Sequence, residues 1–166
     1  TGTDINMGRG RDGSISNSKL GFDYEGRGVS THYLRVDYDY LEAMDIELLA
    51  GRDFSRSFGT DTSAVIINEQ MAAALGGVDK ALGKKIDING EPTIIGVVRD
   101  FNFKDLRQDV AALTMSINPN TSSAVRYIFV RVKTDNLAKA LADVEKVWKG
   151  INPKAVSEAS YLDENT

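Results

Sequence analysis

The sequence predicts an α+β fold, in which mixed sheets pack against a small number of helices. Three local patterns support this prediction: a long amphipathic helix near the C-terminus, a strand joined directly to a helix, and a β-hairpin. The chain has 166 residues, of which 42% are hydrophobic, so it is long and apolar enough to bury a core of its own. We therefore expect one compact domain.

The clearest helical pattern lies near the C-terminus. Asp135 or Asn136 can cap this helix, and Gly150 and Pro153 end it. Its apolar residues recur every three or four positions and form one stripe: Leu137, Ala140, Leu141, Val144, Val147, Trp148 and Ile151. A stripe with this spacing usually faces a protein core, so we expect it to be buried, with an interface as the alternative.

A strand and a helix follow one another between residues 64 and 75 with almost no linker. Ala64 to Ile67 is a short apolar run of the kind found in buried strands. Asn68 is placed to cap the helix that follows, and Gly76-Gly77 ends it.

A hairpin is expected next along the chain. Ile86 to Ile88 and Thr93 to Val98 flank Asn89-Gly90, two residues that tolerate the positive φ angles of a type I′ turn. Pro92 has no N–H to donate, so it should lie at the start of a strand or on a sheet edge.

Several shorter elements complete the prediction. Residues 1 to 28 are rich in Gly, Ser, Asn and Asp and predict a loop or a frayed terminus. A short helix capped by Asp37 or Asp39 is expected around Tyr40 to Met44, and one helical turn at Lys104 to Gln108. Further strands are expected at His32 to Val36, Ile46 to Leu49, Ala111 to Ile117, Tyr127 to Val132 and Ala155 to Leu162.

Charge and composition exclude several classes of function. With 20 Lys and Arg against 24 Asp and Glu, the net charge is −4, so we do not expect a nucleic-acid partner. The absence of cysteine excludes disulfides, thiolate metal sites and cysteine nucleophiles. No stretch approaches the roughly 18 to 20 consecutive apolar residues of a membrane helix, and the chain as written is expected to be soluble. It could nevertheless be a piece of a longer protein.

The residues that could carry chemistry do not form a recognisable catalytic motif. His32 is the only histidine, and no serine lies in a nucleophile-elbow motif. Asp37, Asp39, Asp100 and Asp105 could hold a hard cation, but helix caps and solvated turns account for such aspartates more simply. We therefore expect no enzyme activity, no catalytic residue, no metal site and no cofactor.

Two other classes of function stay open as alternatives. A small metal-dependent hydrolase would use Asp37, Asp39, Asp100 and His32, and it requires these side chains to cluster. A free-standing ligand-binding module would instead require a preformed apolar pocket with convergent polar groups.

Seven fragments occur in a characteristic order over about 130 residues. They are Val36 to Leu41, Ile46 to Ser55, Asp61 with Ala64 to Glu69, Leu82 to Ile86, Ile94 to Phe103, Phe129 to Val132 with the helix Leu137 to Trp148, and Asn152-Pro153 with Tyr161 to Glu164. This order resembles the MacB-like periplasmic core domain of FtsX-family permeases of ABC transporters, of the Bacteroidetes type.

The resemblance implies a two-lobed domain and assigns structural roles to its motif residues. Residues 31–51 and 104–166 would form a porter-like lobe, residues 52–103 an inserted, β-rich, sabre-like lobe, and residues 1–30 carry little of the pattern. Glycines would serve turns or close backbone approach, and aspartates hydrogen-bonded turns. The motif residues are Gly51, Arg52, Asp53, Phe54, Asn68, Gly83, Gly96, Val97, Asp100 and Phe101.

The resemblance also implies a function and a location. The domain would belong to a membrane-embedded, dimeric inner-membrane permease and would lie in the periplasm. It would couple ATP hydrolysis by a cytoplasmic ABC ATPase to motion and to engagement of a periplasmic adaptor, lipoprotein or peptide, in export, efflux or lipoprotein handling. The resemblance does not name the transported substrate.

Overall fold

The computed structural model describes residues 1–4, 19–103, 109–117, 126–154, 156 and 159–161. The strands are β1 (Gly2–Thr3), β2 (Lys19–Tyr24), β3 (Arg27–Arg35), β4 (Leu48–Gly51), β5 (Ala64–Asn68), β6 (Thr93–Val98), β7 (Leu113–Ser116) and β8 (Tyr127–Ile128). The helices are α1 (Tyr40–Ala43), α2 (Glu69–Ala74), α3 (Val78–Ala81) and α4 (Leu137–Ile151), with a 3-10 helix η1 (Gly59–Ser63).

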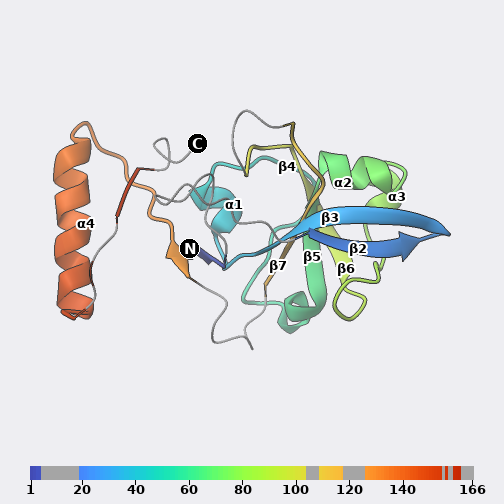
Figure 1. The fold of residues 1–166 in the computed structure, drawn as a ribbon, viewed down its shortest axis with the longest axis horizontal. Coiled ribbons are helices and arrows are strands. Elements are labelled where there is room, and N and C mark those ends of the chain that lie inside the picture. Colours follow the sequence, from blue (N-terminus) through green and yellow to red (C-terminus); the bar gives the residue numbers. More distant parts are fainter. Residues whose placement is uncertain (5–18, 104–108, 118–125, 155, 157–158, 162–166) are drawn as a thin grey trace.

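A six-stranded mixed sheet dominates the fold, with the strand order β2-β3-β7-β5-β6-β4 (Figure 1). The β3–β7 and β5–β6 pairs are parallel, whereas the β2–β3, β5–β7 and β4–β6 pairs are antiparallel. β1 and β8 form a separate antiparallel pair. Strands and helices are therefore mixed without a regular βαβ order, which confirms the predicted α+β class.

The six-stranded sheet crosses both boundaries expected for the inserted lobe. β5 and β6 come from residues 52–103, whereas β4, β7 and all of β3 except its start come from residues 31–51 and 104–166. These two groups of strands nevertheless pair directly, because β4 pairs with β6, and β7 pairs with both β5 and β3. One sheet therefore contains strands from both of the expected lobes.

Alternation along the central strands divides the core between the two faces of the sheet. Val65 and Ile67 face a cluster that includes Met71 of α2 and Ala81 of α3. Ile66, between them, faces a second cluster that includes Tyr40 and Leu41 of α1. Because side chains of a strand point alternately to opposite faces, β5 contributes to both cores and is buried throughout.

The strand-to-helix junction at Asn68 forms as the sequence predicts. β5 ends at Asn68, whose side-chain oxygen accepts a hydrogen bond from the backbone N–H of Met71, three residues into α2. Gly76 and Gly77 then adopt φ angles of 98° and 110° and end the helix. The short helix α3 follows immediately and has no counterpart in the prediction.

The expected hairpin is only partly correct. Thr93–Val98 forms β6, and Asn89 and Gly90 do adopt positive φ angles of 49° and 104°. The other arm is not a strand: Lys85 forms an isolated antiparallel bridge with Thr93. Glu91 also has a positive φ, of 57°, so the connection is a longer loop than a two-residue type I′ turn.

The N-terminal region contains more structure than its composition indicates. Residues 19–24 form β2, which pairs with β3 across Glu25-Gly26, where φ is 52° and 77°. Leu20, Phe22 and Tyr24 alternate along β2 and pack on the first core. This alternation is a strand signal that the Gly-rich and Ser-rich composition of the segment obscures.

Other boundaries differ from the prediction by a few residues. The strand expected at Ile46 to Leu49 begins two residues later, as β4. Asp39 occupies the N-cap position of α1, but its φ is 65° and its side chain makes no capping hydrogen bond. The strand expected from Tyr127 to Val132 ends at Ile128.

Two expected elements cannot be compared in full. The helical turn at Lys104 to Gln108 lies outside the described residues. The strand expected at Ala155 to Leu162 lies partly outside them, and its described positions are not in a strand.

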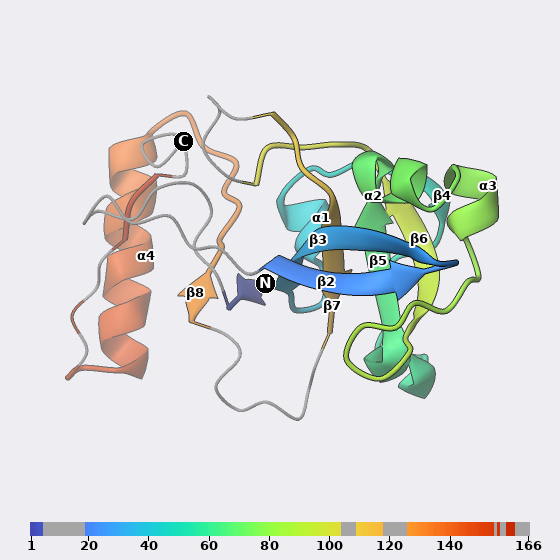
Figure 2. The ribbon, with the colours of Figure 1, turned by 45° about the vertical axis from the view of Figure 1, so that its right-hand side comes forward.

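We predicted that the apolar stripe of the C-terminal helix is buried. In the part of the chain that the structure describes, this prediction is wrong. α4 forms at the expected place, and Asn136 caps it by accepting a hydrogen bond from the backbone N–H of Lys139. However, none of its residues is buried, and Val147 and Ile151 are 62% and 74% exposed. Figures 1 and 2 both show α4 apart from the six-stranded sheet, so spacing alone identified an apolar face but not what covers it.

Two glycines allow β4 and β6 to approach one another closely. Gly51 and Gly96 are register partners, and Gly51 has a φ of 76°. A Cβ atom on Gly51 would lie 2.1 Å from the carbonyl oxygen of Ile95, and one on Gly96 would lie 2.5 Å from that of Arg52. Backbone therefore occupies the space that any side chain would need at either position.

Replacing Gly51 with Ala should destabilise the domain by about 2 to 4 kcal/mol, because a Cβ atom would both overlap backbone and disfavour the positive φ. Urea unfolding followed by circular dichroism measures this change. Gly28→Ala is the matched control, since a Cβ atom there meets nothing within 4 Å. The control should change the free energy of unfolding by less than about 0.5 kcal/mol, and equal losses in the two variants would contradict the assignment.

Candidate functional site

An ion pair with one buried partner holds the loop that follows β4. Arg52 donates from Nη2 to Oδ1 of Asp61 at 2.6 Å and from Nη1 to Oδ2 at 2.9 Å, a two-pronged contact between guanidinium and carboxylate. The Asp61 side chain is 1% exposed, whereas that of Arg52 is 37% exposed. Asp61 is thus the inner partner, and Arg52 covers it from the solvent side.

Further contacts around this ion pair satisfy the buried carboxylate and position the loop. The backbone N–H of Ser55 donates to Oδ2 of Asp61 at 2.8 Å, and Arg52 also donates to the carbonyl oxygen of Asp53 at 3.1 Å. The guanidinium carbon of Arg52 lies 4.2 Å from the centre of the Phe58 ring, a cation–π contact. The hydrogen bonds from Arg52 hold the pKa of Asp61 below its ordinary value.

Asp53 and Phe54 complete the turn next to the ion pair. Oδ1 of Asp53 accepts a hydrogen bond from the backbone N–H of Phe54 at 2.7 Å, and the Phe54 side chain is buried in the second core. Burial raises the pKa of Asp53, although this hydrogen bond opposes the rise. Arg52, Asp53 and Phe54 therefore form a folded turn in which side chains bond to backbone.

Asn68 and Asp100 connect the start of α2 to neighbouring strands. Oδ1 of Asn68 accepts from the backbone N–H of Leu113 as well as from Met71, and its Nδ2 donates to the carbonyl oxygen of Ala111. Oδ1 of Asp100 accepts from the backbone N–H of Gln70 at 3.1 Å. These two side chains tie α2 to the segments at β7 and just after β6.

The remaining motif residues lie in the sheet or beside it. Val97 is fully buried in the first core, and Phe101 packs against the second core and contacts the Phe103 ring edge-on at 6.0 Å between ring centroids. Gly83 has a φ of 79°, and its N–H donates to the carbonyl oxygen of Ile94. Each of these contacts belongs to packing or to chain reversal.

The four residues of the hydrolase alternative take part in separate local contacts. Asp37 accepts from the backbone N–H of Tyr38, and Asp39 pairs with Arg56 at 3.1 Å. His32 is buried, with its ring 5.6 Å from that of Phe103. Among the described residues, no three His, Asp or Glu side chains are grouped so that they could hold a metal ion.

The pairing of Arg52 with Asp61 was not predicted from the sequence. Both residues belong to the recurring fragments, but nine positions separate them and the intervening segment is polar and irregular. The sequence signal was an Arg directly after a glycine that ends a strand, followed by an Asp three residues before a buried strand. Such a signal marks two chain reversals without indicating that they meet.

The sequence matches one family model, and several solved structures resemble the fold. The model described as the MacB-like periplasmic core domain matches residues 11–147. A comparison with curated protein sequences gives no match.

In the described parts of the chain, no helix combines the length and the apolar character required to cross a bilayer.

Two similar structures come from transporters. The periplasmic region of MacB from Actinobacillus actinomycetemcomitans has a TM-score of 0.59 and 18% identity, over 83% of this chain and 66% of that chain. The extracellular domain of the noncanonic ABC-type transporter YknZ from Gram-positive bacteria has a TM-score of 0.58 and 15% identity, over 84% of this chain and 75% of that chain. At sequence identities of 18% and 15%, these similarities show a shared fold and nothing more. This chain covers just under two thirds of the MacB region and three quarters of the YknZ domain.

Replacing Asp61 with Asn should lower the free energy of unfolding at pH 7 by about 2 to 3 kcal/mol, because it removes a charge-assisted contact to a buried position. The exposure of Arg52 keeps this loss below that of a fully buried pair. Since folding lowers the pKa of Asp61, its contribution is complete above the ordinary carboxyl pKa and disappears as the pH falls through the lower, folded-state value.

The difference between wild type and Asp61→Asn should therefore shrink as the pH falls below about 4. Chemical unfolding at a series of pH values measures it. Asp39→Asn is the control, because its pair with Arg56 is exposed on both sides and should contribute less than about 0.5 kcal/mol. A difference that stays constant down to pH 2 would argue against the ion pair as its cause.

Proposed function

Because the chain belongs to the family of MacB-like periplasmic core domains, we propose that it is the extracytoplasmic domain of an ABC-transporter permease and transmits motion. In this proposal an ABC ATPase on the cytoplasmic side supplies the work. Each lobe of the domain moves as a rigid body, and the domain engages a periplasmic adaptor, a lipoprotein or a peptide. The single observation that carries the assignment is the family match over residues 11–147.

The packing of the six-stranded sheet suits this mechanical role. Apolar side chains cover both of its faces, and the central strand β5 is buried at every position. Close-packed interiors have low compressibility, so a displacement applied at one edge moves the whole body. The contacts of Asn68 and of the Arg52–Asp61 pair fix the loops to this body.

The two-lobed organisation is the next part of the proposal. Because one sheet contains strands on both sides of residues 52–103, we place the whole of this sheet in the β-rich lobe, approximately from β2 to β7. The second, porter-like lobe then contains β1, β8 and α4. The two lobes meet where Thr3 of β1 bridges Val36, just after β3, and where Phe129, just after β8, packs against the second core with its ring centroid 6.3 Å from that of Tyr40.

Hydrogen bonds at this junction define where relative motion would be concentrated. The backbone N–H of Asp37 donates to the carbonyl oxygen of Gly2, and that of Asp4 donates to the carbonyl oxygen of Arg35. Two short backbone segments therefore connect β1 to the end of β3. A connection of this kind can absorb a hinge rotation, which would also change the contact of Phe129 with the second core.

The apolar stripe of α4, in which Leu137, Val147 and Ile151 are exposed and the other residues half-buried, provides independent support for a larger assembly. A helix with one apolar face requires a partner surface in a folded protein. We propose that other parts of the same permease cover it and complete the porter-like lobe. The resembling structures are longer than this chain, which agrees with such additional parts. Membrane helices flanking the domain and a dimeric permease belong to the same proposal.

Locking the junction between the lobes should abolish transport by the full-length permease with its ATPase. Thr3→Cys with Val36→Cys places thiols on bridge partners, whose Cα atoms lie within the range that a disulfide spans. This chain has no other cysteine, so the introduced pair can be followed without background from it. Activity should be lost on oxidation and return with reductant.

Gly21→Cys with Ser30→Cys is the matched control for the locked junction. These residues are partners in the β2–β3 pair, so their disulfide would lie inside one lobe. Oxidation of this control should leave transport unchanged. Full transport with the Thr3–Val36 disulfide formed would exclude motion at this junction as the coupling step.

Charges on the exposed stripe of α4 should leave the isolated 166-residue chain intact. Val147→Lys with Ile151→Lys should change its free energy of unfolding by less than about 0.5 kcal/mol, because both side chains are exposed. The same changes should impair assembly of the full-length permease, measured by detergent-resistant yield and transport. Ile66→Ala, at a fully buried position, should cost the isolated chain about 3 kcal/mol. A comparable loss with the two lysines would mean that the stripe is already buried.

A further inference from the structure

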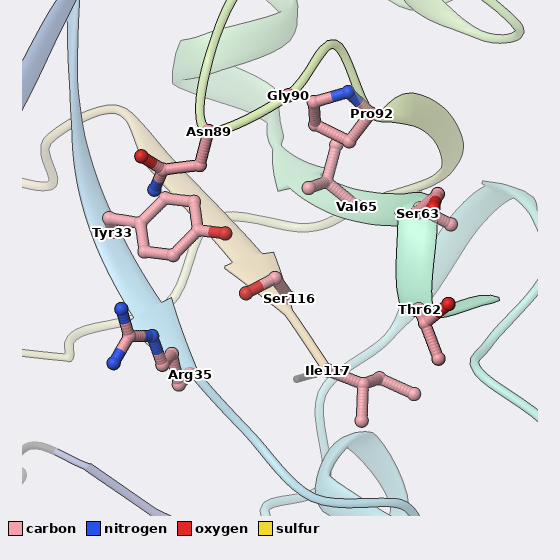
Figure 3. A pocket seen from close by; sticks show the side chains of 11 residues that line it. Tyr33, Arg35, Thr62, Ser63, Val65, Asn89, Gly90, Pro92, Ser116 and Ile117 are labelled. Atoms are coloured by element: carbon pink, nitrogen blue, oxygen red, sulfur yellow. The ribbon is translucent and has the colours of Figure 1, made fainter. Parts of the chain in front are cut away.

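A polar pocket opens at one end of the first core, where the apolar cover of the sheet stops. It has a volume of about 160 Å³ and lies between the ends of β3, β5 and β7 and the loop at residues 89–92 (Figure 3). Tyr33 and Arg35 line it from β3, and Ser116 lines it from β7. Arg35 and Val65 are the register partners of Ser116 on its two sides, so the pocket is built on adjacent strands.

Ser116 places an unused hydroxyl group in this pocket. Ser116 is 5% exposed, and its Oγ is buried with no hydrogen-bond partner. Figure 3 shows this oxygen and the Tyr33 hydroxyl directed toward the same space. A buried hydroxyl without a partner costs folding free energy, and such groups call for an explanation in the form of a ligand or an ordered water.

The loop that covers the pocket has an unusual backbone. Asn89, Gly90 and Glu91 have consecutive positive φ angles of 49°, 104° and 57°. Asparagine and glycine tolerate this region, but the side chain of Glu91 disfavours it by roughly 1 to 2 kcal/mol in general. The conformation aims Asn89 at the pocket, and Pro92 lines it next to the strand β6. Costly backbone of this kind gathers at ligand-binding sites.

The lining groups select the chemistry of a ligand. Arg35 offers a guanidinium, Tyr33 and Ser116 offer hydroxyl donors, and Asn89 offers an amide. None of the described lining residues is acidic, although the carboxylate of Asp4, beside the pocket, accepts a hydrogen bond from the backbone N–H of Arg35 at 3.0 Å and interacts with the charge of Arg35. One guanidinium balances one negative charge, which favours a carboxylate over a doubly charged phosphate. The volume accommodates only a few non-hydrogen atoms beyond the carboxylate.

We propose that this pocket binds a monovalent carboxylate, with Arg35 as the charged partner and the Ser116 hydroxyl as a hydrogen-bond donor. The carboxylate can belong to a small free organic acid or to the C-terminus of a peptide, because both present the same group. The inference rests on the pocket alone and does not require the transport function proposed above.

Titration of the ¹⁵N-labelled 166-residue chain with sodium acetate tests the proposal, with sodium chloride at equal ionic strength as the reference. We expect saturable shifts of the amide signals of Tyr33, Arg35, Asn89 and Ser116, with a dissociation constant on the order of 1 mM for so small a ligand. The amide of Lys139 on α4 should not shift. Absence of saturation up to about 50 mM acetate overturns the proposal.

Two variants separate ligand binding from folding. Arg35→Gln should weaken acetate binding at least about tenfold, because it removes the charge-assisted contact. Ser116→Ala should weaken binding while leaving the melting temperature equal or higher, since it removes an unpaired buried hydroxyl. Thr114→Val is the control on the same strand: its hydroxyl bonds that of Thr31 at 3.0 Å, so the variant should melt a few degrees lower and bind acetate normally. Unchanged affinity in both pocket variants overturns the proposal.

A pair of dipeptides identifies the source of the carboxylate. N-acetyl-Ala-Ala with a free C-terminus should bind in the same pocket, and its amidated form should not. Tighter binding of the free-acid dipeptide than of acetate would identify a peptide C-terminus as the ligand. Tighter binding of acetate would identify a free organic acid. Equal binding of the two dipeptides would overturn carboxylate recognition.

Discussion

The hydrogen bonds of the Asn68 side chain join three parts of the sheet body at one buried point. Its oxygen accepts from the backbone N–H groups of Met71 and Leu113, and its nitrogen donates to the carbonyl oxygen of Ala111. The end of β5, the start of α2 and the approach to β7 are therefore held by one side chain that no water reaches. Both apolar cores depend on this arrangement, because β5 separates them and β7 lies beside it.

The features that the sequence predicted well are those determined by neighbours along the chain. The β5–α2 junction needs only an apolar run, a capping Asn68 and a terminal Gly76-Gly77, all within 14 residues. The positive φ of Asn89 and Gly90 is similarly local. The lost hairpin arm and the partly exposed stripe of α4 depend instead on which distant segment packs against them, and periodicity does not contain that information. The strand β2 was missed for a different reason, because the Gly-rich and Ser-rich composition around it obscures its alternation.

The same distinction applies to the site residues. The family resemblance implied a hydrogen-bonded turn at Asp53, but the pairing of Arg52 with Asp61 follows from two chain reversals that meet in space. The polar pocket was missed entirely, since its lining comes from four separate segments. Its sequence signals, an Arg and a Tyr alternating on β3 and a Ser on β7, are ordinary in any strand. Convergence of such residues becomes visible only when the register of the strands is known.

The position of β7 in the sheet has a consequence for how this chain reaches its native state. β7 is the last of the six strands in the sequence, yet it lies between β3 and β5 in the sheet. Thr114 of β7 pairs with Tyr33 of β3, which lies 81 positions earlier in the chain. Until residues 113–116 emerge during synthesis or export, β3 and β5 each present an open backbone edge beside apolar side chains. Sheet closure is therefore a late, long-range event, during which a holding chaperone would limit aggregation and proteolysis.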